Sequence, residues 1–391
     1  MQFADRLQSL KSNVFGEMDR AKAQARAAGH PIIDLSVGSS DLPTEERVLE
    51  AIAQSLSDPS THGYLLLNGT LPFRQAAADW YTRKFGVSVD AETEVTPLIG
   101  SQEGTAMVPL ALLNPGDFAL VQDPSYPSHT GGVYLAGGQP YFMPLLAENN
   151  FLPVLEDIPA PVLVQAKLMV LSYPHNPTAA IAPLDFFQRA IAFCEQHNLV
   201  LAHDFPYPDL VFDGAPAPSV LQADPEKRRS IEFFSLSKSY NMGGFRVGYA
   251  IGNAALIEKL RQVKAVMGFN QYAGILNGAI AALSGPQDTV AATVQRFRER
   301  RDVLVASLQE MGWAVTAPPA TMYIWTRLPE RWAQDSLGFC TELVAQTGVA
   351  IAPGSGFGKA GEGYIRFALV RDPAALREAV AKMGAFIQSA L

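Results

Sequence analysis

The sequence predicts an α/β protein in which a mostly parallel sheet is covered by helices on both faces. Short apolar runs rich in Val, Leu and Ile recur through the middle of the chain, at 94–99, 118–121, 168–172, 199–202 and 231–234. Several are followed by polar turns and by helix-like segments such as 184–197. Continuous apolar runs that alternate with helices are typical of parallel strands buried on both faces. Ligands bind beyond the carboxyl ends of such strands, so we expect the functional residues there.

The N-terminal segment predicts two helices separated by a strand. Residues from about 10 to 28 form a charged amphipathic pattern that stops at a glycine and is followed by a proline. A short apolar strand is expected at 32–37. A second helix is expected at 44–56, with Thr44 as its N-cap and two glutamates near its start.

The chain changes character after about residue 286. A long charged helix is expected at 289–311, followed by shorter strands around Met322 and Tyr364 and by a closing helix from Pro373. We therefore predict a large domain at 45–285 and a smaller α+β domain made of 1–44 and 286–391.

The composition indicates a folded enzyme that acts on small molecules. The 391 residues are 48% apolar and 17% charged, which is ordinary for a globular protein. The net charge is −8 and the basic residues are scattered, so the sequence does not predict a basic surface that would bind nucleic acid or an anionic membrane. The two cysteines, Cys194 and Cys340, lack the spaced companions of a disulfide framework or a zinc cluster, so no metal is expected. The N-terminus contains no long apolar stretch, and cytoplasmic residence is the default expectation.

A lysine between hydroxyl residues is the most informative feature of the chain. Lys238 lies in FSLSKSYNMGGFRVGY. A lysine amine can form a Schiff base with an aldehyde cofactor. Ser235, Ser237 and Arg246 are the donors that a phosphate beside that aldehyde needs. The segment predicts an anchor for pyridoxal phosphate, although a solvated lysine beside a glycine turn fits the same residues.

Two further segments suit the same ligand. Gly100 and Ser101 in GSQEG follow a strand and open a helix, where exposed N–H groups bind anions; an ordinary strand-to-helix turn is the alternative. Asp204 ends a strand in HDFPYPDL and needs a cationic partner, which a protonated pyridine nitrogen supplies. A helix cap or a salt bridge is the simpler explanation for Asp204. Tyr207 either donates to the ring oxygen of the cofactor or is a half-buried aromatic.

Three more residues are candidates for the site. Asn176 precedes a proline in YPHNPT, and a cis bond there would direct its amide back toward the strand ends; a plain Asn-Pro turn is the alternative. Tyr126 either stacks on a ring or packs in the core. Arg366 stands in an apolar strand, where its planar fork requires an anion, either an internal carboxylate or that of a substrate.

These motifs together resemble the class I/II aminotransferases of pyridoxal phosphate fold type I. The segments that carry the resemblance are GSQEG, YPHNPT, HDFPYPDL, SLSKSYNMGGFRVGY and PGSGFGKAGEGYIRFAL, in this order along nearly the whole chain. The branch that it resembles most contains bacterial glutamate–pyruvate (alanine) transaminases and LL-diaminopimelate aminotransferases.

The resemblance implies a role for each candidate. Lys238 is the Schiff-base lysine and proton shuttle, Asp204 pairs with the ring nitrogen, and Tyr126 stacks on the ring. The remaining implied roles are ring-oxygen partners (Asn176, Tyr207), phosphate ligands (Gly100, Ser101, Gln102, Ser235, Ser237, Arg246), substrate-binding residues (Gly38, Asn176, Arg366) and a phosphate ligand given to the neighbouring subunit of a homodimer (Tyr64). Gln102 departs from the family, which often has a lysine there.

The implied activity is transfer of an amino group between an L-amino acid and a 2-oxo acid by a ping-pong mechanism. Alanine or glutamate with pyruvate or 2-oxoglutarate is the substrate expectation. The alternatives are an LL-diaminopimelate aminotransferase and a beta-elimination lyase on the same fold. A ligand-sensing module of a transcription regulator would need an added DNA-binding domain, for which the residues before the first strand leave no room.

Overall fold

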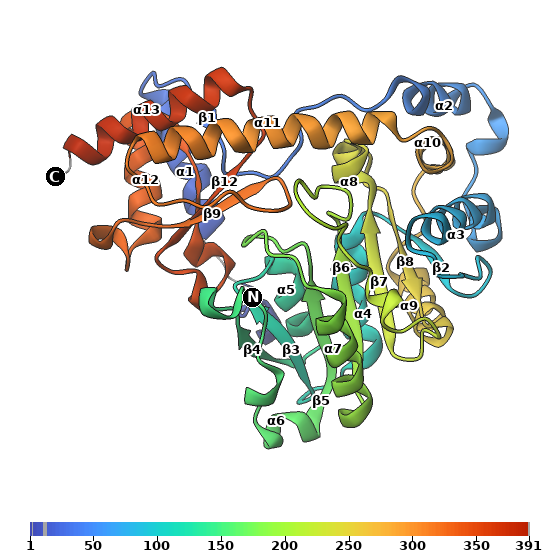
Figure 1. Cartoon of the computed structure of the whole chain (residues 1–391). Coiled ribbons are helices and arrows are strands. Elements are labelled where there is room, and N and C mark those ends of the chain that lie inside the picture. The colour runs from blue at the N-terminus through green and yellow to red at the C-terminus, as the bar shows by residue number, and fades with distance from the viewer. Residues whose placement is uncertain (2, 11–13, 390–391) are drawn as a thin grey trace.

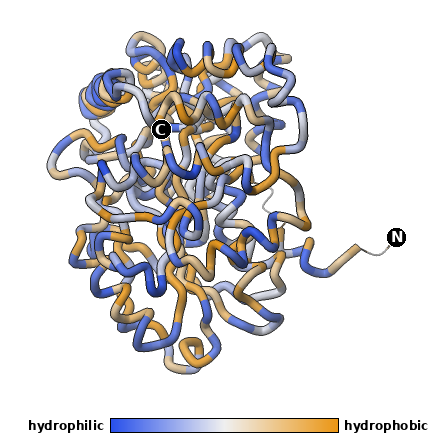
Figure 2. The backbone as a smooth tube through the Cα atoms, turned by 90° about the vertical axis from the view of Figure 1, so that its right-hand side faces the viewer, coloured by the Kyte–Doolittle hydropathy of each residue, from blue (hydrophilic) through white to orange (hydrophobic). Residues whose placement is uncertain are grey.

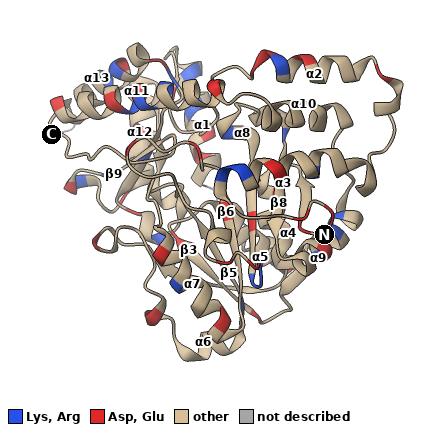
Figure 3. Cartoon of the chain, turned by 45° about the vertical axis from the view of Figure 1, so that its right-hand side comes forward, with Lys and Arg blue, Asp and Glu red and all other residues tan. Residues whose placement is uncertain are grey.

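A computed structural model of the chain describes residues 1, 3–10 and 14–389. Figure 1 shows a large body built around one sheet and a smaller body to which both ends of the chain contribute. Figure 3 shows that acidic and basic residues are interspersed along the ribbon of both bodies. Figure 2 shows short apolar stretches interleaved with polar ones, and none of the described helices is long and apolar enough to cross a membrane.

The large body contains a seven-stranded sheet, and the expected α/β fold is confirmed. Its strands, in spatial order, are β2 (Val95–Leu98), β8 (Gly248–Gly252), β7 (Ser230–Ser235), β6 (Val200–Phe205), β5 (Ala166–Ser172), β3 (Phe118–Asp123) and β4 (Gln139–Pro144). β8 runs antiparallel to both of its neighbours, and all other neighbouring pairs are parallel. The five predicted strands are all present.

Two strands of this sheet, β4 and β8, were not predicted from the sequence. β4 lies at the edge of the sheet and contains Pro140 and Pro144, which suit an edge strand but weaken the strand pattern. β8 begins and ends with glycine, Gly248 and Gly252, and both lie against the backbone of β7. A Cβ at Gly248 would lie 2.4 Å from the carbonyl oxygen of Phe234, so only glycine fits this close approach.

Helices cover both faces of this sheet. One face packs against α4 (Ser101–Leu112), α5 (Pro127–Leu135) and α9 (Ala254–Met267). The other face packs against α3 (Leu71–Phe85), α7 (Leu184–His197) and α10 (Ala273–Ser284), with α6 (Ala160–Gln165) at its edge. α2 (Glu46–Leu56) packs on α10 (Figure 1). The strands are therefore buried on both sides, which explains their continuous apolar runs.

The smaller body has its own apolar core. It contains α1 (Val14–Ala27), α11 (Asp288–Glu310), α12 (Ser336–Thr347) and α13 (Pro373–Ser389). Its strands are β9 (Tyr323–Arg327), β11 (Ala352–Pro353) and β12 (Tyr364–Ala368), which form an antiparallel sheet, and the parallel pair β1 (Ile33–Asp34) and β10 (Val349–Ala350). Domain boundaries at 44/45 and 285/286 stay a prediction, and the separate core supports them.

The N-terminal segment differs from its prediction at the strand expected at 32–37, which is shorter and covers Ile33–Asp34, and at the start of the second helix. The first helix is described from Val14, and residues 11–13 of the predicted range lie outside the described residues. Thr44 is not the N-cap of α2: the helix begins at Glu46, and Glu45 precedes it. The Thr44 hydroxyl instead donates to the carbonyl oxygen of Asn241 at 2.8 Å, because the chain here crosses the turn that follows Lys238.

Short helical turns connect these elements. One of them, α8 (Leu236–Ser239), is a single α-helical turn that carries Lys238. The 3-10 turns are Asp5–Leu7, Pro59–Thr61, Leu67–Thr70, Ala147–Asn149, Leu155–Asp157, Val220–Gln222, Gly243–Phe245, Glu330–Trp332, Gly354–Phe357 and Lys359–Gly361.

Candidate active site

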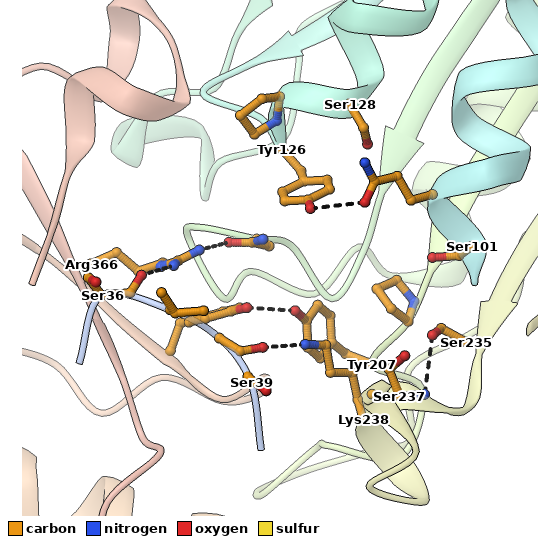
Figure 4. A pocket seen from close by; sticks show the side chains of 18 of the residues that line it. Ser36, Ser39, Ser101, Tyr126, Ser128, Tyr207, Ser235, Ser237, Lys238 and Arg366 are labelled. Atoms are coloured by element: carbon orange, nitrogen blue, oxygen red, sulfur yellow. Dashed lines mark hydrogen bonds between the residues drawn. The ribbon is translucent and has the colours of Figure 1, made fainter. Parts of the chain in front are cut away.

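A pocket of about 560 Å³ lies between the carboxyl ends of the large sheet and the smaller body. The predicted site residues that line it are Gly38, Ser101, Gln102, Tyr126, Asn176, Asp204, Tyr207, Ser235, Ser237, Lys238, Arg246 and Arg366. Figure 4 shows Arg366 and Ser36 at one end of the pocket and Ser101, Ser235 and Ser237 at the other. Parallel strands deliver these side chains because their carboxyl ends meet at one edge of the sheet.

The connection between β7 and β8 builds the end that carries the serines. Because Ser235 and Gly248 are paired in the sheet, the loop between them turns back on itself and holds Lys238 and Arg246 near the same strand ends. Ser235 Oγ accepts a bond from the N–H of Ser237 at 3.2 Å. The Ser237 hydroxyl is buried and has no hydrogen-bond partner within the described residues.

The first turn of α4 joins this end from a different strand. Gly100 has a φ of 75°, and a Cβ there would lie 2.5 Å from Arg246 Nη2. Glycine therefore allows the guanidinium to lie against the start of α4, beside Ser101. The helix N-terminus, the hydroxyls and Arg246 together form a site for a phosphate group.

Lys238 lies at the centre of the pocket floor (Figure 4). Its Nζ donates to the carbonyl oxygen of Gly38 and lies 5.8 Å from the centre of the Tyr207 ring. Both contacts are with neutral groups. A partly buried amine with neutral neighbours is free to bond with an electrophile.

Asp204 is held by a histidine that was not identified from the sequence. His129 Nε2 lies 3.1 Å from Asp204 Oδ2, and Asp204 is 6% exposed. Its other oxygen, Oδ1, is buried without a partner among the described residues. His129 stands three residues after Tyr126 in the first turn of α5, which is the signal that could have found it. The bare oxygen fits a cationic N–H of a ligand.

Tyr126 lies at the top of the pocket in Figure 4, and Gln102 also lines the pocket. The Tyr126 hydroxyl donates to Gln102 Oε1 at 3.4 Å. Gln102 therefore contacts the predicted stacking residue. Burial raises the pKa of Tyr126 above its usual value, so the ring is neutral at working pH.

Tyr207 pairs with a tyrosine of the smaller body. Its hydroxyl lies 2.9 Å from that of Tyr323 on β9, which also lines the pocket. Burial, followed by the neighbouring Tyr323, raises the pKa of Tyr207 well above its usual value. Tyr207 therefore remains a hydrogen-bond donor at working pH.

Arg366 projects into the pocket from β12. Its Nη1 donates to Asn176 Oδ1 at 2.8 Å and its Nη2 to the carbonyl oxygen of Ser36 at 2.7 Å. Its guanidinium carbon lies 4.2 Å from the Tyr323 ring centre and 4.6 Å from that of Phe357. Both bonds go to neutral oxygens, so these contacts leave the charge of a buried arginine unmatched and fit a carboxylate ligand.

The loop that carries Asn176 reaches across the pocket from β5. The Asn176–Pro177 bond is cis, which answers a question that the sequence left open, and the bond before Pro174 is cis as well. The N–H of Tyr173 donates to His203 Nε2 at 3.1 Å, which ties the start of this loop to β6.

Tyr64 is the one predicted side chain that lies outside the pocket lining. It is 84% exposed, and its ring packs on that of Phe269 at 5.1 Å. Gly100 is not itself in the lining but lies directly behind Arg246. The pocket also takes in residues that were not singled out from the sequence, of which Ser36, Lys22 and Asp19 come from the N-terminal segment.

The residues present fit pyridoxal phosphate. A phosphate group suits the unpaired Ser237 hydroxyl and Arg246, and a pyridinium N–H suits the unpaired Asp204 Oδ1. Lys238 lies in the same pocket with its amine available for the aldehyde. These three features match the phosphate, the ring nitrogen and the aldehyde of the cofactor.

Comparison with known proteins agrees with this fit. Residues 30–383 match the sequence model of the family described as aminotransferase class I and II. The chain is 43% identical over 386 residues to an LL-diaminopimelate aminotransferase of Dehalococcoides mccartyi, with 99% of each chain covered. A similar enzyme of Moorella thermoacetica with the same name is 42% identical over 383 residues, with 98% of each covered.

A solved structure supports the same assignment. The probable N-succinyldiaminopimelate aminotransferase of Thermus thermophilus is 43% identical with a TM-score of 0.90, covering 95% of this chain and 99% of that one. The chain belongs to the class I and II aminotransferases, which are pyridoxal phosphate-dependent enzymes of fold type I.

Proposed function

We propose that this aminotransferase moves an amino group between LL-diaminopimelate and a 2-oxo acid. The observation that carries the proposal is the identity of 43% over 99% of the chain with a relative named LL-diaminopimelate aminotransferase. This relative supports the alternative named in the sequence analysis better than the expected alanine or glutamate substrate. A pocket of about 560 Å³ has room for the cofactor and a long amino acid together.

Two residues of the large body are proposed to carry the chemistry. When bound, pyridoxal phosphate supplies an aldehyde that accepts the amino group and a ring that stabilises negative charge on the substrate. Lys238 Nζ would hold that aldehyde at rest and, once released from it, would take up the proton of the substrate α-carbon. Asp204 keeps the ring nitrogen protonated, and His129 orients the Asp204 carboxylate through its 3.1 Å contact.

The remaining pocket residues are proposed to hold the cofactor in place. The phosphate ligands are the first turn of α4 (Gly100, Ser101, Gln102) and the β7–β8 connection (Ser235, Ser237, Arg246). Tyr126 stacks on the ring. Asn176 and Tyr207 bind the ring oxygen, and the raised pKa of Tyr207 makes it a donor to that oxygen.

Arg366 is proposed to bind the α-carboxylate of the substrate. Arg366 is 5% exposed, and the oxygens that it contacts are neutral. The substrate carboxylate would give its guanidinium a charged partner. Asn176 and the backbone of Gly38 complete this end. Arg366 thereby fixes the α-carbon relative to Lys238, which is the orientation that proton transfer requires.

We also propose that the active unit is a homodimer. Tyr64, Leu66, Val266, Met267 and Phe269 are all more than half exposed. Asn270 Nδ2 donates to the carbonyl oxygen of Leu65 at 2.9 Å, so the two segments lie side by side and form one apolar surface. Such a surface fits a partner subunit. Tyr64 would then bind the phosphate of the cofactor in the pocket of that partner subunit. Sedimentation of the holoenzyme as a monomer at micromolar concentration would contradict this.

A donor and acceptor screen tests the proposed substrate. LL-diaminopimelate with 2-oxoglutarate should give glutamate at a higher kcat/KM than alanine does. An N-succinylated diaminopimelate belongs in the same screen, because the Thermus thermophilus relative carries that name. A preference for alanine would contradict the proposal. Release of pyruvate and ammonia from an amino acid with a leaving group on its β-carbon, in the absence of an acceptor, would indicate a lyase instead.

A further inference from the structure

The pocket extends onto helix α1, where a cluster of charged residues has no role in the steps described so far. Asp19 and Lys22 of this helix line the pocket. Lys22 Nζ lies 2.8 Å from a carboxylate oxygen of Asp19 and 3.2 Å from one of Asp34. The cluster therefore places a cation and two carboxylates at the side of the pocket formed by the N-terminal segment.

Ser36 connects this cluster to Arg366. Its Oγ lies 3.5 Å from Lys22 Nζ, and its carbonyl oxygen accepts the bond from Arg366 Nη2 at 2.7 Å. The two oxygens of one serine are at most about 5 Å apart, so Lys22 Nζ lies within about 11 Å of Arg366 Nη2. An extended carbon chain gains about 1.3 Å per bond. A second carboxylate six bonds from the first therefore reaches Lys22 when Arg366 holds the first.

Lys22 is charged and can exchange one of its partners. Burial alone would lower its pKa, but the bonds to Asp19 and Asp34 outweigh burial and the pKa is raised. Asp34 is fixed by the Ser36 N–H at 2.9 Å and the Ser36 hydroxyl at 2.6 Å. The Asp19 side chain, in contrast, is 73% exposed. Its contact with Lys22 is shorter than that of Asp34, at 2.8 Å against 3.2 Å, but because the Asp19 carboxylate is exposed to solvent the contact opens at little cost.

We propose that Asp19 and Lys22 form a subsite for the far end of the amino donor, in which Lys22 binds a distal carboxylate and Asp19 a distal ammonium group. The inference rests on the proposed function, because LL-diaminopimelate carries both groups on its far carbon. When this end of the donor binds, the ion pair between Asp19 and Lys22 is replaced by two ion pairs. Lys22 then pairs with the distal carboxylate and Asp19 with the distal ammonium group. A donor that lacks one of these groups makes only one of the two contacts, which provides discrimination.

A series of amino donors separates the two contacts. LL-Diaminopimelate carries both distal groups, L-2-aminopimelate only the carboxylate, L-lysine only the ammonium, and L-norleucine neither. In holoenzyme with Lys22→Met, kcat/KM should fall about tenfold or more for the two donors with a distal carboxylate and little for the other two. Asp19→Asn should lower kcat/KM for diaminopimelate and lysine instead.

A matched control and a binding assay accompany this series. Arg20→Met removes a positive charge from the same helix, where the side chain is 61% exposed, and should leave the donor pattern unchanged. Pimelate and heptanoate bind without reacting, so their dissociation constants report the subsite even if no donor is turned over. Pimelate should bind wild-type holoenzyme about tenfold more tightly than heptanoate, and Lys22→Met should remove the difference.

Two results would overturn the subsite. One is an equal loss for all four donors in Lys22→Met, which would indicate a structural role for the Lys22–Asp34 contact. The other is equal binding of pimelate and heptanoate by the wild type. If instead the wild type does not turn over LL-diaminopimelate, while Lys22→Met still weakens the binding of pimelate, the proposed function is wrong and the subsite is supported.

Discussion

The two ends of the pocket are built in different ways. The end with Ser235, Ser237 and Arg246 comes largely from one connection of the sequence, between β7 and β8. The end with Arg366 comes from segments far apart, since Arg366 bonds to Asn176 and Ser36, which are 190 and 330 residues away. A short motif can therefore specify the cofactor end, whereas only the folded chain assembles the substrate end.

Because the two ends of the pocket bind different molecules, mutations at each end should impair the enzyme in different ways. Changes at the cofactor end should affect every substrate alike, because the cofactor takes part in each reaction. Changes at the substrate end should affect KM and substrate choice. Variants at each end therefore test whether the two ends behave separately.

Lys238→Ala should have the largest effect. Loss of the attachment point and of the proton carrier should lower kcat by about 10⁴-fold or more with every donor. Steady-state rates and the absorption of the bound cofactor are the measurements. Lys259→Ala, on the exposed side of α9, is the control. Retained activity in Lys238→Ala would remove the basis of the proposed chemistry.

Asp204→Asn should follow, with kcat reduced by about 10²- to 10³-fold, because the amide cannot keep the ring nitrogen charged. His129→Asn should cost less, about tenfold, because it only orients one carboxylate oxygen. Single-turnover rates with a saturating donor measure both. The explanation is wrong if the His129 variant is the slower of the two.

Arg366→Lys should act on substrate binding. Lysine keeps the charge but loses the fork, so KM for the amino donor should rise about 10- to 100-fold while the affinity for the cofactor stays within about twofold. Arg327→Lys, on the neighbouring strand β9, provides a matched control. A variant that loses the cofactor as well would contradict the separation of the two ends.

Ser237→Ala should have a smaller effect, confined to the cofactor. Removal of one hydroxyl from the phosphate site should weaken cofactor binding by about 3- to 10-fold, with KM for the donor unchanged. Equilibrium dialysis of the apoenzyme measures the change, and Ser57→Ala on the exposed end of α2 is the control. An unchanged cofactor affinity would show that Ser237 does not bind the phosphate.

The pH dependence of stability tests the loop that carries Asn176. Burial, followed by the neighbouring His129, lowers the pKa of His175 to about 3. In the unfolded chain this pKa is about 6.5, so the unfolded state binds more protons between these two values. The free energy of unfolding should therefore fall as the pH falls below about 6.5, by up to about 1.4 kcal/mol per pH unit. His175→Gln should flatten this slope in urea titrations, and an identical slope would count against a buried neutral His175.

Most residues that the sequence motifs singled out line the pocket, at both of its ends, whereas several residues that contact them were missed. Lys238, Asp204 and Arg246 follow strands of one sheet, and strand order brings them together by a general rule of parallel sheets. His129 was missed because its contact with Asp204 joins two elements, α5 and β6, that lie 75 residues apart in the sequence. Lys22 and Ser36 were missed because their contacts with the pocket depend on how α1 and the segment after β1 pack within the smaller body. Thr44 was assigned as a cap because the sequence does not show the bond that it makes with Asn241.

The most direct test of the proposed chemistry uses the two lysines that line the pocket, Lys238 and Lys22. Borohydride reduction of the holoenzyme, followed by mass spectrometry of its peptides, locates the lysine that carries the cofactor. We expect one phosphopyridoxyl group per chain, on Lys238, with Lys22 unmodified. A label on Lys22, or on any lysine outside the β7–β8 connection, would contradict this assignment.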